Sequence, residues 1–117
     1  MLTRPKVVPD PARVRQIRGS FGWIDHRLLR EGHLANMGLA EIALYLFLVL
    51  AANRQGVSWY RKEHIAKVLG ISEEEFHHAR ERLVQKHLIV FSPFRPGDVN
   101  GYCQVLPLES LSELRRG

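Results

Sequence analysis

Residues 65–79 read IAKVLGISEEEFHHA, and the rest of the chain is interpreted around them. The stretch predicts a helix-turn-helix: a short helix, a tight turn at Gly70, where glycine supplies the backbone freedom, and a second helix. Small Ala66 stands where the two helices would cross. Apolar side chains at helical spacing predict the seam between the helices. The seam residues are Ile65, Leu69, Ile71, Phe76 and Ala79.

The second helix of this pair is expected over residues 72–87. Ser72 and Glu75 form the S-x-x-E pattern of a capping box at its start. Glu73 and Glu74 complete a first turn of three glutamates, and the helix dipole stabilises a carboxylate there by about 0.3–1 kcal/mol. The glutamates therefore have a structural explanation, but they also neutralise a helix end that would otherwise attract phosphate.

A helix is also predicted over residues 38–53, with Gly38 as its N-cap. Its body, IALYLFLVLAA, is apolar on every face, so we expect it to be covered on more than one side. A second copy of the chain would supply part of that cover, with Leu44, Phe47 and Leu48 in the dimer interface. The alternative is that residues 21–34 and the C-terminal segment wrap the helix within one monomer.

Shorter elements are expected on both sides of these helices. The first helix of the pair should span residues 62–69, although no good capping residue precedes it. Two β-rich runs around a loop with two prolines and two glycines predict a β-hairpin. The remaining expected elements are a short helix at 26–31, a strand at 57–60, the hairpin strands at 89–91 and 102–106, and a terminal helix at 109–116.

Helix, strand, helix, turn, helix and β-hairpin follow one another in the order of the winged helix-turn-helix superfamily. The stretch GVSWYRKEHIAKVLGISEEEFHHARERLVQKHLIVF resembles the winged-helix domains of plasmid and phage replication initiators and of primosomal DnaD-like proteins. In those domains a G-x-S-W strand precedes the helix-turn-helix, and a glycine usually stands where this chain has His87. The resemblance covers about residues 38–106. It implies a mainly α fold with a small β-wing (α+β), and double-stranded DNA as the partner, often bound by a dimer.

The chain departs from that family at the start of the recognition helix, where DNA-reading members usually carry Ser, Thr, Arg or Lys. A carboxylate there can accept a hydrogen bond from cytosine N4, but affinity for phosphates must come from elsewhere. We expect it from helix residues, from a wing at about 91–102 and from an N-terminal arm. The expected DNA-binding residues are Arg4, Lys6, Arg13, Arg15, Arg18, Arg61, Lys62, Lys67, Ser72, Glu73, His77, His78, Arg82 and Arg95.

The net charge of +5 is concentrated in the first 20 of the 117 residues, which carry five basic and one acidic side chain. The other 97 residues carry 12 basic and 11 acidic side chains. This asymmetry predicts a flexible basic arm at 1–20, one winged-helix domain at 21–108 and a short tail at 109–117. The arm is interpreted either as an electrostatic tether to phosphates or as a solubilising tail.

No motif predicts an enzyme, a cofactor or a metal site. HExxH, P-loop, GxGxxG and GxSxG patterns are missing from the sequence. His77 and His78 are adjacent, so on a helix they project about 100° apart and cannot share one metal ion. The single cysteine, Cys103, the absence of a signal-peptide core and an apolar run of only eleven residues predict a cytoplasmic protein that does not span a membrane.

Two functions are compatible with these patterns. The first is a DNA-binding winged-helix protein that acts in replication initiation, transcription control or a mobile element, with a homodimer or another protein of such a complex as further partners. The second is a winged-helix protein–protein interaction module that binds a basic partner through its acidic recognition helix.

Overall fold

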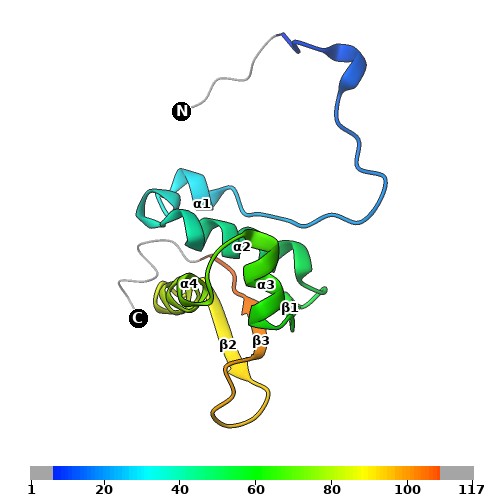
Figure 1. Cartoon of the computed structure of the whole chain (residues 1–117). Coiled ribbons are helices and arrows are strands. Elements are labelled where there is room, and N and C mark those ends of the chain that lie inside the picture. Colours follow the sequence, from blue (N-terminus) through cyan, green and yellow to red (C-terminus); the bar gives the residue numbers. More distant parts are fainter. Residues whose placement is uncertain (1–6, 109–117) are drawn as a thin grey trace.

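The computed structural model describes residues 7–108, over which four α-helices and two 3₁₀ turns accompany a small three-stranded antiparallel sheet. The fold class is therefore α+β. In chain order the elements are the 3₁₀ turn Pro11–Arg13, α1 (Arg27–Arg30), the 3₁₀ turn Leu34–Asn36, α2 (Leu39–Ala51), β1 (Val57–Ser58), α3 (Lys62–Leu69), α4 (Glu73–Gln85), β2 (Ile89–Pro93) and β3 (Gly101–Val105) (Figure 1).

Helix α2 begins after Gly38, as predicted, and lies across α4. Two of the three predicted dimer-interface residues are wrong, because Leu44 and Leu48 are only 1% exposed and belong to the core of the monomer. Phe47 is half-buried, with its ring edge-to-face against Tyr60 at 5.3 Å. Within one copy the side of α2 that carries Leu39, Leu46 and Leu50 is exposed, so its cover by a second copy of the chain remains a prediction.

Helices α3 and α4 have the predicted positions and end in the same way. Gly70 and His87 both adopt left-handed backbone conformations, with φ of 69° and 61°. In each case the next residue's N–H donates back to a carbonyl five residues earlier, Ile71 to Ala66 and Leu88 to Leu83. This is the Schellman arrangement, which favours glycine at the left-handed position. His87 therefore occupies a position that glycine would occupy with less strain.

The sheet has the strand order β1–β3–β2, so β3 lies in the middle and pairs with both neighbours antiparallel. The predicted hairpin is confirmed, with β2 longer than expected and β1 limited to two residues. Gly101 faces Pro93 across the hairpin. A Cβ on Gly101 would lie 2.1 Å from the Ser92 carbonyl oxygen, so this close approach of the two strands excludes any side chain.

The core lies between α2, α4 and the sheet. Its largest fully buried side chains are Phe76, Leu44, Leu48, Ile65, Leu83 and Ile89. Cys103 on β3 is buried among them. Among the described residues, no helix is long and apolar enough to cross a membrane.

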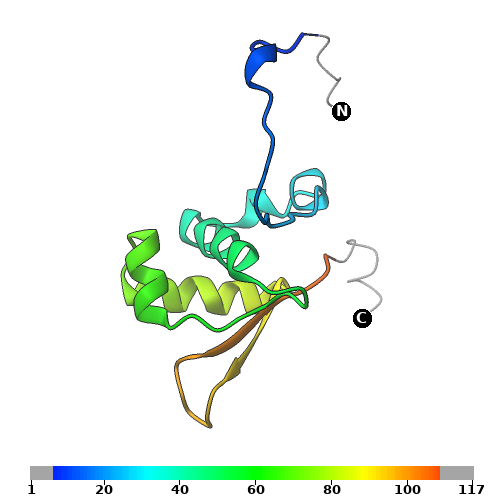
Figure 2. The same ribbon diagram turned by 90° about the vertical axis from the view of Figure 1, so that its right-hand side faces the viewer.

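The segment before α1 runs beside the C-terminal end of α2. Gly22 lies so close to Val49 and Leu50 that a Cβ would be 3.2–3.3 Å from their atoms. Residues 7–20 then extend away from the body, on the side opposite the β2–β3 hairpin (Figures 1 and 2). The predicted terminal helix at 109–116 lies outside the described residues.

Candidate nucleic-acid interface

The start of α4 is organised by its own side chains. The Ser72 hydroxyl accepts a hydrogen bond from the Glu75 N–H at 3.0 Å, and the Glu75 carboxylate accepts one from the Ser72 N–H at 2.9 Å. This reciprocal pair is the predicted capping box, and it satisfies two backbone donors at the helix start. Both side chains are therefore engaged with α4 itself, while the Ser72 hydroxyl, which accepts in this pair, keeps its own O–H as a donor.

Glu73 is exposed but paired, because its carboxylate accepts a hydrogen bond from the Lys62 ammonium at the start of α3. This hydrogen bond is the main cause of a raised pKa for Lys62 and of a lowered pKa for Glu73. The two predicted DNA-binding residues lie together, but they neutralise each other. Either one would need to exchange its partner for a nucleic-acid group in order to bind DNA directly.

Arg82 is also held within the protein. Glu41, buried at the start of α2, accepts a hydrogen bond from Arg82 Nε at 2.7 Å and another from Lys86 Nζ at 2.6 Å. Burial opposes ionisation of Glu41, but hydrogen bonds from Lys86, from the Gly38 N–H and from Arg82 outweigh it, so the pKa of Glu41 lies below its usual value. One carboxylate thus joins α2 to Arg82 on α4 and to Lys86, the residue that follows α4.

The other cation of α4, Arg80, contacts the hairpin. Its guanidinium stacks over the Phe91 ring at 3.8 Å and donates a hydrogen bond to the Val99 carbonyl at 2.8 Å. Beside it, buried Asn100 accepts a hydrogen bond from the Lys62 N–H at 2.7 Å. The end of the hairpin loop is therefore attached both to α4 and to the first turn of α3.

His77 and His78 have different surroundings. His77 is half-buried, and burial, followed by the positive charges of Arg80 and Lys62, lowers its pKa. It is therefore neutral near pH 7 and can donate or accept a hydrogen bond. His78 is exposed beside the groove between α4 and the start of α2. Among the predicted residues, the structure brings Lys62, Glu73 and His77 together, and the Lys62 N–H is bonded to Asn100 of the hairpin loop.

The other predicted cations are exposed but dispersed. Arg61 lies 3.8 Å from Glu63, whereas Lys67 and Arg95 have no ion pair among residues 7–108. Lys67 is on α3, and Arg95 is in the loop of the hairpin. In the arm, Arg13 pairs with Asp10 at 2.5 Å, and Arg15 and Arg18 are exposed. Arg4 and Lys6 lie outside the described residues.

The outward surface of α4 is acidic. Helical spacing places Glu74, His78, Glu81 and Gln85 on one stripe, and all four are exposed. Neither glutamate has an ion-pair partner in the described part of the chain. The stripe thus carries two negative charges, of which Glu81 interacts electrostatically with the neighbouring Arg80 guanidinium.

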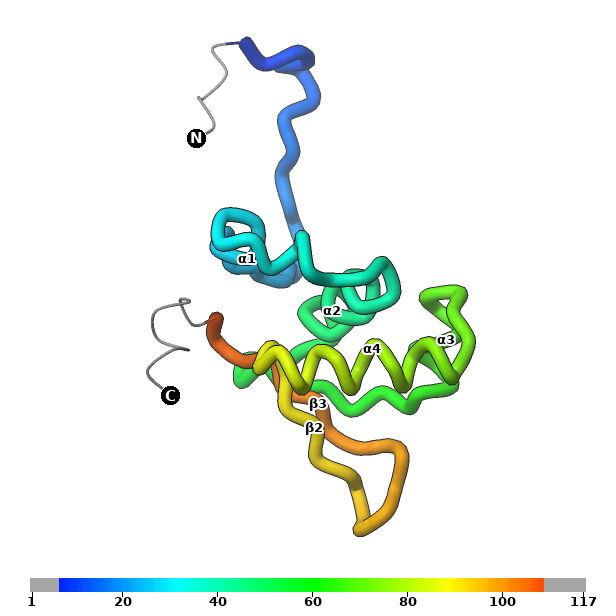
Figure 3. Tube along the Cα trace, turned by 90° about the vertical axis from the view of Figure 1, so that its left-hand side faces the viewer, coloured from blue at the N-terminus to red at the C-terminus, as the bar shows by residue number. Residues whose placement is uncertain are grey.

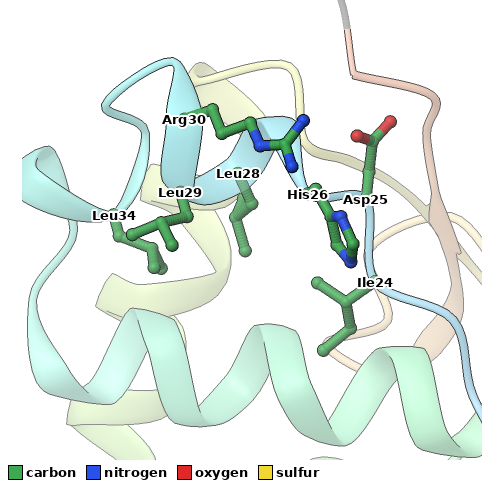
Figure 4. A pocket seen from close by; sticks show the side chains of 7 residues that line it. All are labelled: Ile24, Asp25, His26, Leu28, Leu29, Arg30 and Leu34. Carbon is green, nitrogen blue, oxygen red and sulfur yellow. The ribbon is translucent and has the colours of Figure 1, made fainter. Parts of the chain in front are cut away.

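A hollow lies between α1 and α2, bordered by Ile24, Leu28, Leu29 and Leu34 (Figure 4). At its rim the Asp25 carboxylate accepts hydrogen bonds from Arg27, with Nη2 at 2.9 Å, and these bonds lower the pKa of Asp25. Asp25 thus orders the first turn of α1. Within residues 7–108, no group of three His, Cys, Asp or Glu side chains could hold a metal ion.

Sequence reasoning missed two residues that shape this surface, Glu41 and Asn100. Glu41 had no signal beyond its place in the first turn of an apolar helix, where it is the one charged residue. Asn100 precedes Gly101 in a turn-rich loop, which predicted a turn and not a cap. The missing cap of α3 was the available signal, since a helix start without its own cap needs an acceptor from elsewhere.

Comparisons with known proteins add no identification. No family model, curated protein or solved structure matches the chain.

Proposed function

We propose that the protein is a winged-helix protein that binds double-stranded DNA with the side of the fold that carries α3, α4 and the β2–β3 hairpin. The observation that carries the proposal is the arrangement of these elements. Two helices joined by a three-residue turn pack on α2, and a hairpin follows them in a sheet ordered β1–β3–β2. The attachment of the hairpin to both helices supports a single, preformed surface (Figure 3).

Affinity in this proposal comes from cations at the edges of the surface and not from α4. Arg82, Lys86 and Arg80 are engaged inside the protein, so Lys67 on α3 and Arg95 in the hairpin loop are the exposed candidates for phosphate contacts. The arm begins on the opposite side of the body. It would add phosphate contacts by wrapping round the duplex or by reaching a neighbouring one.

The test is fluorescence anisotropy with a random duplex of about 25 base pairs over a salt series. The slope of log K against log salt is negative, and each lost phosphate contact reduces its magnitude by about 1. Arg95→Ala and Lys67→Ala are each expected to reduce the magnitude of the slope by about that amount. The matched control is Arg30→Ala, an exposed cation on α1, which should leave the slope unchanged. Absence of duplex binding by the folded protein at about 50 mM salt would refute the proposal.

The acidic stripe of α4 supports a second candidate, a module that binds a basic protein. Glu74→Gln separates the two functions, because Glu74 has no ion pair among the described residues whereas Glu73 is paired with Lys62. If α4 faces DNA, removing this charge should strengthen non-specific DNA binding several-fold. If α4 faces a basic protein, the substitution should leave DNA binding unchanged and weaken the protein complex.

A further inference from the structure

The outer side of α2 is an apolar surface that stays largely exposed in the described chain. Leu39, Leu46 and Leu50 are 86%, 45% and 64% exposed. With the half-buried Ala43 they recur at spacings of four, three and four residues, which places all four on one stripe opposite the core. We call these four residues the outer stripe of α2. The one charged residue of α2, Glu41, is buried on the other side of the helix.

Two aromatic side chains extend this surface at the C-terminal end of α2. Phe21 and Trp23 are 63% and 83% exposed, and they line one hollow together with Val49 and Leu50. The three leucines and two rings together expose roughly 600 Å² of apolar surface per copy. That is at the upper limit of the largest apolar patch on a typical monomer, about 300–600 Å².

We propose that the occupant of this surface is a second copy of the chain, packed outer stripe against outer stripe. The four–three–four spacing is that of a helix–helix seam, and small Ala43 in the middle of the stripe permits close approach of two α2 helices. An uncharged stripe is complementary to itself, as a two-fold interface requires. Two such faces would bury about 1,200 Å², the lower end of the range for stable specific interfaces, so we expect a micromolar dimer.

The dimer would determine how the protein meets DNA, and this step rests on the function proposed above. The outer stripe lies on the side of α2 opposite its buried residues, whereas α4 packs against the buried side and is followed by the hairpin. In a two-fold dimer the contacting faces point toward each other, so the hairpins of the two copies point away from each other. Such a dimer would hold two duplex segments on opposite sides instead of two half-sites of one palindrome.

The dimer is tested with the full-length chain by sedimentation velocity between about 5 and 200 μM. Salt of about 0.3 M screens repulsion between the basic arms. The wild-type chain should approach twice its mass of 13.5 kDa within this range. Leu46→Glu should raise the dissociation constant of the dimer at least tenfold. The control Val68→Glu, at a 57% exposed valine on α3, should leave this constant unchanged. A wild-type chain that is monomeric at 200 μM, or dimerisation that survives Leu46→Glu, overturns the proposal.

A cysteine introduced at the outer stripe gives a test that adds no charge. Cys103 is the one native cysteine; it is buried, and burial raises the pKa of its thiol. Under mild oxidation Ala43→Cys should therefore form an intermolecular disulfide, and the matched Val68→Cys should not. Equal cross-linking of the two variants would indicate random collision and would contradict the interface.

Bridging is tested by capture of a labelled duplex on beads that carry an unlabelled duplex. Wild type should capture the labelled duplex, and Leu46→Glu should capture at least fivefold less while it binds a single duplex normally. A dimer that binds DNA but captures no second duplex overturns the bridging role. If neither protein binds any duplex, the proposed function and the bridging role both fail, while sedimentation still decides the dimer.

Discussion

Replacing Asn100 by alanine should loosen the start of α3 and the hairpin together. The Asn100 side chain is 2% exposed, and its Oδ1 accepts a hydrogen bond from the Lys62 N–H at 2.7 Å. Arg61, at the N-cap position of α3, makes no side-chain capping hydrogen bond. Asn100 therefore acts as the cap of a helix that begins 38 residues earlier in the chain.

The magnitude follows from the loss of this one hydrogen bond. Loss of an N-cap side chain costs about 0.5–2 kcal/mol, and the upper end applies here because the N–H left without an acceptor is partly buried. Asn100→Ala should thus lower the free energy of unfolding by about 2 kcal/mol. For a domain of this size that corresponds to a fall of about 10 °C in melting temperature.

The assay is urea unfolding followed by circular dichroism, with amide hydrogen exchange at Lys62 as a local readout. Asn100→Asp keeps an acceptor at the helix start and should lose at least about 1 kcal/mol less than Asn100→Ala. The control is Gln85→Ala, at an exposed position on α4, which should stay within about 0.5 kcal/mol of wild type. An Asn100→Ala variant as stable as that control would refute the capping role, and equal losses in both Asn100 variants would assign the effect to packing.

Two other residues yield predictions of stability. The folded-state pKa of Glu41 is lowered, so its contribution is present above the unfolded pKa near 4.5 and is lost as the pH falls through the folded value. Glu41→Gln should therefore reduce stability at pH 7 and flatten its decline below pH 5, as measured by urea unfolding at each pH; an unchanged acid decline would contradict this. His87→Gly should raise stability by about 0.5–1 kcal/mol, because it relieves a left-handed residue with an exposed side chain. Gly70→Ala is the matched reverse change and should lower the free energy of unfolding. A His87→Gly variant less stable than wild type would contradict the prediction and would show that the imidazole itself stabilises the fold.

Local signals were sufficient for the α3–α4 pair. Ser72 and Glu75 define the start of α4 by hydrogen bonds within four residues, and Gly70 ends α3 through its own backbone conformation. Both effects act over one helical turn, so residues that are neighbours in the sequence are enough to predict them. The β-hairpin was equally accessible, because its loop residues are typical of turns. The winged-helix resemblance and the DNA partner remain predictions.

Charge availability could not be read in the same way. Arg82 and Lys62 were predicted to bind DNA because they lie on the two helices of the helix-turn-helix. Arg82, however, is paired with Glu41, 41 residues away, and Lys62 with Glu73, 11 residues away. Whether a cation is free depends on which carboxylate the fold brings within about 4 Å. The spacing of residues along one helix does not predict which carboxylate from another element will lie near a given cation.

By itself, the sequence determined the helix pair, the hairpin and the apolar character of α2, since each depends on contacts between near neighbours or on composition. Only the tertiary structure decided which side of α2 is exposed. Apolar residues on every face remove the periodicity that would distinguish inside from outside. Packing against α4 and the sheet then buried Leu44 and Leu48 and left Leu39, Leu46 and Leu50 facing outward.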